Sequence, residues 1–143
     1  MTKPAIRLAA VLIALTSPTL FAQEASAPKP AAPTAHVLTV PELDALLAKP
    51  DHVLLIDVRR PDEVSTVGGF PVYLSVQASD LEKSLAWIPK DRTIVTVSNH
   101  AGRAGKAADL LSSKGFKVAG AVGAETYEKA GGKIAHVKVP TAK

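Results

Sequence analysis

The sequence predicts an α/β fold, a three-layer sandwich in which helices flank a central, mostly parallel sheet. Three observations predict it. Near-continuous apolar runs of strand length recur along the chain, segments of helical periodicity separate them, and small or polar residues follow the runs. Strands that are apolar at successive positions are typical of parallel sheets buried on both faces. Strands that alternate with helices build such layered sheets.

The expected elements follow one another in a regular order. We expect strands over residues 52–58, 72–76, 93–97 and 116–122, preceded by a β-prone segment at 36–39. We expect helices over residues 40–49, 79–88, 102–115 and 124–132, and a single helical turn within 59–70. Pro41 suits the first turn of a helix, Ser79 is the expected cap of the second helix, and Gly115 ends the third.

Residues 1–22 have the three-part layout of a secretory signal peptide. Lys3 and Arg7 give a positive start, Leu8–Leu15 is a short apolar run, and small residues lead to Ala22. A membrane span requires about 20 apolar residues, and this run is far shorter. We therefore predict a periplasmic or secreted protein, with no membrane span after cleavage behind Ala22. An uncleaved tether is the alternative.

The rest of the chain divides into a leader and a single domain. Residues 23–35 contain Ala, Pro and polar residues without periodicity, so we expect a flexible segment with nothing that can be buried. Residues 36–140 carry all the expected strands and helices and form one domain.

The composition excludes several classes of function. The chain has no cysteine, which removes a disulfide framework, a thiolate metal site and a cysteine nucleophile. Its formal net charge of +4 is spread without a basic stripe, so we expect no nucleic-acid binding. His100 stands without paired ligands and predicts no metal site. Nothing in the sequence indicates a cofactor.

The candidate site is the stretch that joins the apolar run at 93–97 to the following helix. It consists of Ser98, Asn99, His100, Ala101, Gly102 and Arg103. Ligands of parallel α/β sheets bind at the carboxyl ends of the strands, and the N–H groups at the start of a helix attract anions. A nucleophilic serine would need a base, and no histidine can be placed beside Ser98 from sequence. We favour Ser98 as a small residue that ends a buried strand.

Four local patterns, in this order, resemble the rhodanese family of thiosulfate sulfurtransferase-like domains. They are LLIDVRRPDEV at 54–64, VGGFP at 67–71, IVTVSNHAGRAGKAADLLSSKGF at 94–116 and VAGAVGAETYEKAGGKI at 118–134. The resemblance covers roughly residues 36–135. It implies the rhodanese form of the α/β sandwich, with Tyr127 where the family usually has Trp.

The resemblance also implies what the loop does. In the family a cysteine opens the loop and carries a sulfane sulfur as a persulfide, and an arginine at the helix start helps to bind the oxyanion of the donor. Ser98 and Arg103 occupy these two positions with the same spacing. A serine hydroxyl cannot form a persulfide. We therefore expect an exported rhodanese-like domain without sulfurtransferase activity, a pseudoenzyme.

Binding is then the expected function. The ligand at Ser98–Arg103 would be a partner protein or a small oxyanion such as thiosulfate, sulfate or phosphate. For Arg103 the structural alternative is an exposed helix residue with a surface partner. For the whole chain the alternative is a sulfur-handling enzyme that uses a non-cysteine mechanism.

Neighbouring residues also depart from the family pattern or have two interpretations. Ala101 replaces a loop glycine, a need that Gly102 beside it would meet, while Gly69 replaces a histidine. Ala104 replaces a hydroxyl-bearing residue.

Asp57 and Arg59 match the family's Asp-Val-Arg segment and would line the pocket rim. The interpretation we favour is structural: Asp57 bonds loop amides, and Arg59 pairs with Glu63 or another acid. We expect Trp87 to make a core or cap contact.

Overall fold

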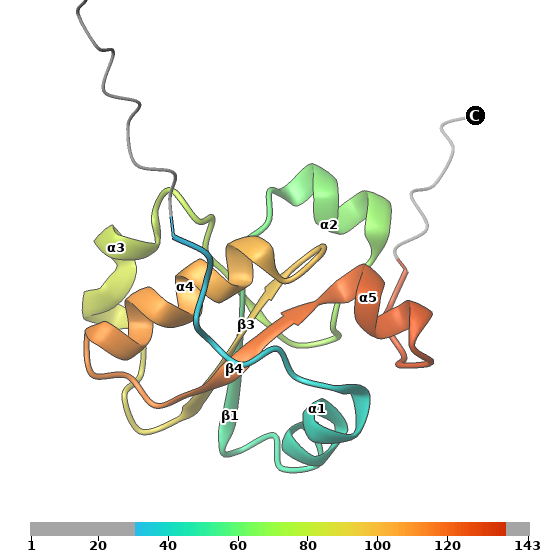
Figure 1. The fold of residues 1–143 in the computed structure, drawn as a ribbon, viewed down its shortest axis with the longest axis horizontal. Helices are drawn as coiled ribbons and strands as arrows, with labels where there is room; N and C mark the ends of the chain where they lie inside the picture. Colours follow the sequence, from blue (N-terminus) through green and yellow to red (C-terminus); the bar gives the residue numbers. More distant parts are fainter. Residues whose placement is uncertain (1–30, 137–143) are drawn as a thin grey trace, which may run out of the picture. The chain divides into compact units, whose positions relative to one another are not determined.

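A computed structural model describes residues 31–136 and contains the predicted parallel sheet (Figure 1). The described strands are β1 (Val53–Asp57), β2 (Leu74–Ser75), β3 (Thr93–Ser98) and β4 (Val118–Gly123). They lie in the order β2-β1-β3-β4, and each neighbouring pair is parallel. The predicted fold class is confirmed. The predicted signal peptide and residues 137–140 of the predicted domain lie outside the described residues.

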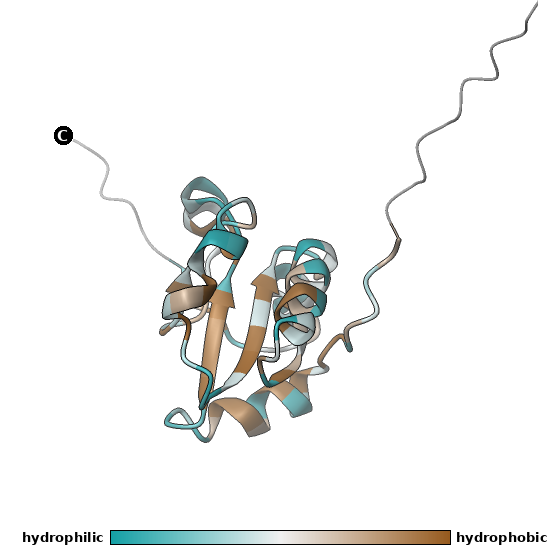
Figure 2. Cartoon of the chain, turned by 90° about the vertical axis from the view of Figure 1, so that its left-hand side faces the viewer, coloured by the Kyte–Doolittle hydropathy of each residue, from teal (hydrophilic) through white to brown (hydrophobic). Residues whose placement is uncertain are grey.

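Helices cover both faces of this sheet. They are α1 (Val40–Leu47), α2 (Pro61–Val67), α3 (Leu81–Ser84) with the 3-10 turn η1 (Leu85–Trp87), α4 (Gly102–Ser113) and α5 (Ala124–Lys129). Leu43 and Tyr127 bring α1 and α5 into the core on one face. Leu81 and Leu111 bring α3 and α4 into the core on the other. Figure 2 shows the apolar strands lying between the helices, which makes the three layers visible. Within residues 31–136, no helix is long and apolar enough to cross a membrane.

Two helical predictions need correction. The segment at 59–70 holds the seven-residue helix α2 rather than one turn, because Pro61 starts it and the Glu63 carboxylate accepts the Arg60 N–H at 3.0 Å. The helix expected at 79–88 is shorter, since it begins at Leu81 and tightens into η1. Its N-cap residue is Asp80 rather than Ser79, whose hydroxyl lies 3.4 Å from the Asp80 carboxylate.

Trp87 does not join the core. Its side chain ends η1 and is 58% exposed, while the next residue, Ile88, is buried in the core beside α3 and α4. The expected core contact therefore belongs to Ile88.

The last residues of the predicted leader pack on α4. The backbone N–H and the hydroxyl of Thr34 donate to the Asp109 carboxylate at 2.8 and 2.9 Å. Ala35 lies against the small apolar cluster that contains Ala104. A Cβ atom on Gly105 would stand 2.6 Å from Pro33, so a glycine is needed for this approach. The domain thus begins before residue 36, and we call residues 33–35 the strap.

Candidate functional site

A short loop joins the end of β3 to the start of α4 (Figure 1), and Ser98 immediately precedes this loop. Ser98 is the last residue of the strand and is almost completely buried. The backbone N–H of Ala104, in the first turn of the helix, donates to the Ser98 hydroxyl oxygen at 3.1 Å. The side chain at this position therefore points toward the helix N-terminus, where N–H groups stabilise negative charge.

Ala101 bends the loop into the helix. It is the one residue other than glycine with positive φ within residues 31–136, at 64°, in the left-handed region. Gly102 does not take over this conformation, as the sequence suggested, because it is already the first residue of α4. The loop backbone also rests on Gly123, where a Cβ atom would come within 2.9 Å of Ala101 N. Alanine in this conformation costs roughly 1 kcal/mol relative to glycine.

Asp57 and Arg59 form a buried ion pair beneath the loop. The Arg59 guanidinium donates to both Asp57 oxygens, at 2.7 to 3.2 Å, and Asp57 also accepts the Arg59 backbone N–H. Arg59 further donates to the Asn99 amide oxygen at 3.1 Å. Neither charged side chain is exposed. Arg59 thus has an acid as its partner, as the structural interpretation expected, and that acid is Asp57. The Asp57 carboxylate accepts one backbone N–H, that of Arg59, and both side chains are buried.

Glu63, on α2, pairs instead with Arg103. The Arg103 guanidinium donates to the two Glu63 oxygens at 2.5 and 2.8 Å. Asn99 donates to the same carboxylate at 3.3 Å. The Arg103 hydrogen bonds, together with the Arg60 N–H, hold the pKa of Glu63 at about 2, and the carboxylate in turn raises the pKa of Arg103. A surface partner for Arg103 was one of the two expectations from the sequence, but no local pattern identifies Glu63 as that partner, because 40 positions separate the two residues.

Comparison with known families decides the identity of this arrangement. The model of the rhodanese-like domain matches residues 39–123, which is more than half of the chain. The chain belongs to the rhodanese-like domain family. This confirms the resemblance inferred from the four sequence patterns. No curated protein matches the chain.

Solved structures share the rhodanese-like fold. A rhodanese-related protein from Thermoplasma volcanium is 19% identical, with a TM-score of 0.60 over 70% of this chain and 97% of that one. A protein of unknown function from Rhodopseudomonas palustris CGA009, described as a possible tyrosine phosphatase, is 25% identical, with a TM-score of 0.61 over 71% and 85%. A thiosulfate sulfurtransferase from Pseudomonas aeruginosa is 21% identical, with a TM-score of 0.60 over 71% of this chain and 20% of that one.

The rhodanese-like loop of this chain carries no nucleophile paired with a base. His100 is exposed and lies 3.7 Å from Glu125. His36 and His136 contact Glu42 and Glu128. His52 precedes β1, at the other end of the sheet. Within the described part of the chain, no histidine hydrogen-bonds Ser98, and no three His, Asp or Glu side chains gather as metal ligands.

Two positions where this chain departs from the rhodanese pattern, Gly69 and Tyr127, fit the packing around them. A Cβ atom at Gly69 would lie 3.1 Å from the Arg59 guanidinium, so the missing side chain leaves room for the buried pair. Tyr127 packs on Phe70 with ring centres 5.3 Å apart and donates its hydroxyl hydrogen to Asp44. Burial, followed by the nearby Asp44, raises the pKa of Tyr127 to about 12. The Tyr127 ring therefore joins α5 to α1.

Proposed function

We propose that this rhodanese-like domain does not transfer sulfur and acts as a binding module. The observation that carries the proposal is the hydroxyl of Ser98 at the position where the family has its thiolate, buried and bonded to the Ala104 N–H. A hydroxyl has no sulfur with which to form a persulfide, and the chain contains no cysteine to replace it.

The ligand we propose is a small oxyanion held by Arg103 at the start of α4. A guanidinium next to a helix N-terminus suits sulfate, phosphate or thiosulfate. The Glu63 carboxylate already accepts two charge-assisted hydrogen bonds from Arg103, so such a ligand has to displace it. An acidic group on a partner protein has the same chemistry and is the second candidate.

Two enzymatic alternatives find less support. A sulfur-handling mechanism without cysteine needs another atom to carry the sulfur, and Ser98 has no base within the described residues. The Rhodopseudomonas relative is described as a possible tyrosine phosphatase. A serine in this loop would need the same kind of activation to attack a phosphate ester.

Replacement of Ser98 by cysteine tests the proposal. The thiolate introduced at position 98 would attack the sulfane sulfur of thiosulfate, which forms a persulfide and releases sulfite. Cyanide would then take the outer sulfur of the persulfide and leave as thiocyanate. We expect no thiocyanate from the natural protein and measurable thiocyanate from Ser98→Cys. Ser113→Cys, which adds an exposed thiol at the end of α4, is the control for unspecific thiol reactivity.

Two results of the thiocyanate assay would speak against a loop that lacks only its nucleophile. Turnover by the natural protein would contradict the proposal. If Ser98→Cys were no better than Ser113→Cys, the loop would lack more than its nucleophile, and Ala101 would be the next position to restore to glycine.

We also propose that the protein is exported. The support is the layout of residues 1–22, which the structure does not describe. Mass spectrometry of the protein recovered from a host that exports it should give a mature chain that starts at Gln23. A chain that retains the N-terminal segment in the membrane fraction would indicate a tether instead.

A further inference from the structure

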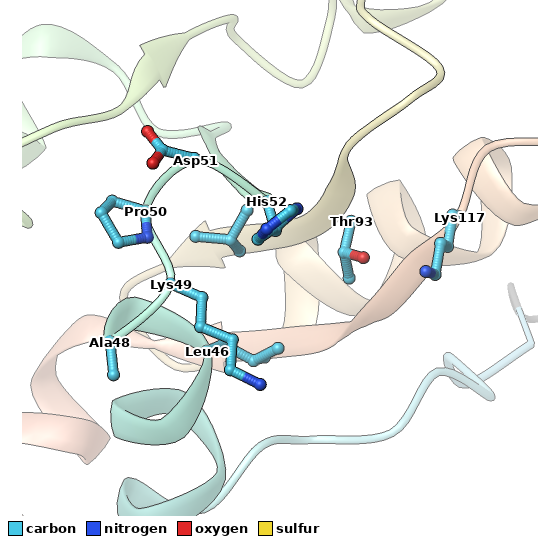
Figure 3. A pocket seen from close by; sticks show the side chains of 9 residues that line it. Leu46, Ala48, Lys49, Pro50, Asp51, His52, Thr93 and Lys117 are labelled. Carbon is cyan, nitrogen blue, oxygen red and sulfur yellow. The ribbon is translucent and has the colours of Figure 1, made fainter.

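A cavity lies at the opposite end of the sheet from Ser98. Its volume is about 690 Å³, and it opens where β1 and β3 begin, at Val53 and Thr93 (Figure 3). Small-molecule sites commonly have volumes of about 300–1,000 Å³. Ser98 ends the strand that Thr93 begins, so at a rise of about 3.3 Å per residue the two positions are roughly 17 Å apart. The cavity is therefore separate from the rhodanese loop.

Two lysines approach this cavity from opposite sides. In Figure 3, Lys49, which follows α1, and Lys117, which precedes β4, lie on opposite sides of Thr93. Asp51 is the acidic lining residue, and its carboxylate points away from both ammonium groups. Within residues 31–136, the lysines that lie within 4 Å of a carboxylate are Lys83, Lys114 and Lys129, and neither Lys49 nor Lys117 is among them.

Three other lysines of the domain do have acidic neighbours. The ammonium groups of Lys83, Lys114 and Lys129 lie 3.6 to 3.8 Å from carboxylate oxygens of Asp80, Glu82 and Glu125. Within the described residues, the two lysines of the cavity thus form no ion pair, although Asp51 lies in the same lining.

Two further polar side chains lie between the two lysines. The His52 ring and the Thr93 hydroxyl face the same space in Figure 3, and no hydrogen bond from either side chain is formed within the described part of the chain. Their backbones are fixed, because the Thr93 N–H donates to the His52 carbonyl at 2.8 Å and the Ile94 N–H donates to the Lys117 carbonyl at 2.7 Å. The sheet therefore fixes how far apart the backbones of His52, Thr93 and Lys117 lie.

The rest of the lining is apolar. Leu46 from α1 and Val53 from β1 line the cavity beside the polar groups. A ligand that matches both parts has an anionic head and an apolar body, since ammonium groups and free donors require acceptors with negative charge.

We propose that this cavity binds a small, soluble organic phosphate monoester. The phosphate lies between Lys49 and Lys117 and accepts hydrogen bonds from Thr93 and His52. The apolar group of the ligand lies on Leu46 and Val53. A phosphate monoester fits better than a monocarboxylate, because two cations match its two negative charges and its three terminal oxygens can accept all four donors.

NMR titration of the full chain with phenyl phosphate tests this site. We expect saturable shifts at His52 and Thr93, and binding at least about tenfold weaker for inorganic phosphate and for benzyl alcohol, each of which lacks one part of the ligand. The double variant Lys49→Ala/Lys117→Ala should bind phenyl phosphate about tenfold more weakly. Lys83→Ala/Lys129→Ala is the control, because it removes the same charge elsewhere.

Three results would overturn the proposal. They are the absence of saturable shifts at His52 and Thr93 at millimolar phenyl phosphate, equal binding of benzyl alcohol or inorganic phosphate, and an equal loss of affinity in the two double variants. None of them bears on the Ser98 loop, since the proposed function is tested by thiocyanate formation at the other end of β3.

Discussion

Glu63 is the residue on which the state of the rhodanese loop most depends. Its carboxylate binds Arg103 through two hydrogen bonds, accepts from Asn99, and caps α2 through the Arg60 N–H. Asn99 in turn accepts from Arg59, which is paired with Asp57. One carboxylate thus joins the loop to the buried ion pair and supplies the negative charge that an oxyanion ligand would otherwise bring.

The first prediction concerns Glu63→Gln and ligand binding. The amide keeps the shape of the side chain but removes the charge that competes for Arg103, so sulfate should bind about tenfold more tightly than to the natural protein. NMR shifts at residues 99–104 measure the affinity. Asp62→Asn is the matched control, because Asp62 is a neighbouring, exposed carboxylate that pairs with Arg60. Equal gains in both variants would mean that only the net charge matters.

The second prediction concerns the pH dependence of stability. The pKa of Glu63 is about 2 in the folded protein, against an ordinary value of 4.5. Because the folded pKa is lowered, the stabilisation is fully present above about pH 4.5 and is lost as the pH falls toward 2. We expect Glu63→Gln to cost about 1 kcal/mol at neutral pH. Urea unfolding should show this difference shrinking below about pH 4.5. A constant difference would contradict the assignment.

The sequence could predict the positions of these residues but not their pairing. The Ser98-to-Arg103 spacing marked the loop, and the Asp-Val-Arg segment marked Asp57 and Arg59 as residues near it, since both are local patterns. The contact between Glu63 and Arg103 depends on how α2 sits over the carboxyl end of the sheet, which no local pattern records. The same holds for the cavity at the other end, whose lysines come from segments far apart in the sequence.

At the scale of elements, α4 shows where sequence reasoning succeeded and where it failed. Its start at Gly102 and its end before Gly115 were predicted, and Gly115 has the expected left-handed conformation, with φ of 81°. The strap on its outer face was not predicted. Ala and Pro without periodicity indicate flexibility, but a row of small residues on a helix lets such a segment pack closely. Composition alone cannot show this complementarity.

The third prediction compares two glycines of α4. A Cβ atom at Gly105 would stand 2.6 Å from Pro33, whereas nothing lies within 4 Å of a Cβ atom at Gly102. Gly105→Ala should displace the strap, break the contacts of Thr34 with Asp109, and leave the protein about 1 kcal/mol less stable than Gly102→Ala. Urea unfolding and hydrogen exchange of the Thr34 amide measure the two effects. Equal stability with a protected Thr34 amide would show that the strap can shift without loss.

At the scale of the whole molecule, one sheet supports two cores. Along β3, Ile94 faces the core beside α3 and α4, while Val95 faces the core beside α1 and α5. The chain has no cysteine, so noncovalent contacts hold the two sides to the sheet without a disulfide. The two cores pack on opposite faces of the same strands. The loss of one core therefore disrupts the strands on which the other core packs.

The last prediction is that Ile94→Ala weakens both sides of the sheet together. Ile94 is fully buried, and truncation of such a side chain costs about 2–5 kcal/mol of a total of about 5–15 kcal/mol. Urea unfolding followed by the NMR signals of Leu43 and Leu111, one on each face, should give a single midpoint that falls equally for both. Val72→Ala, at a side chain that is 81% exposed, should leave the midpoint unchanged. Separate midpoints for Leu43 and Leu111 would show that the faces unfold independently.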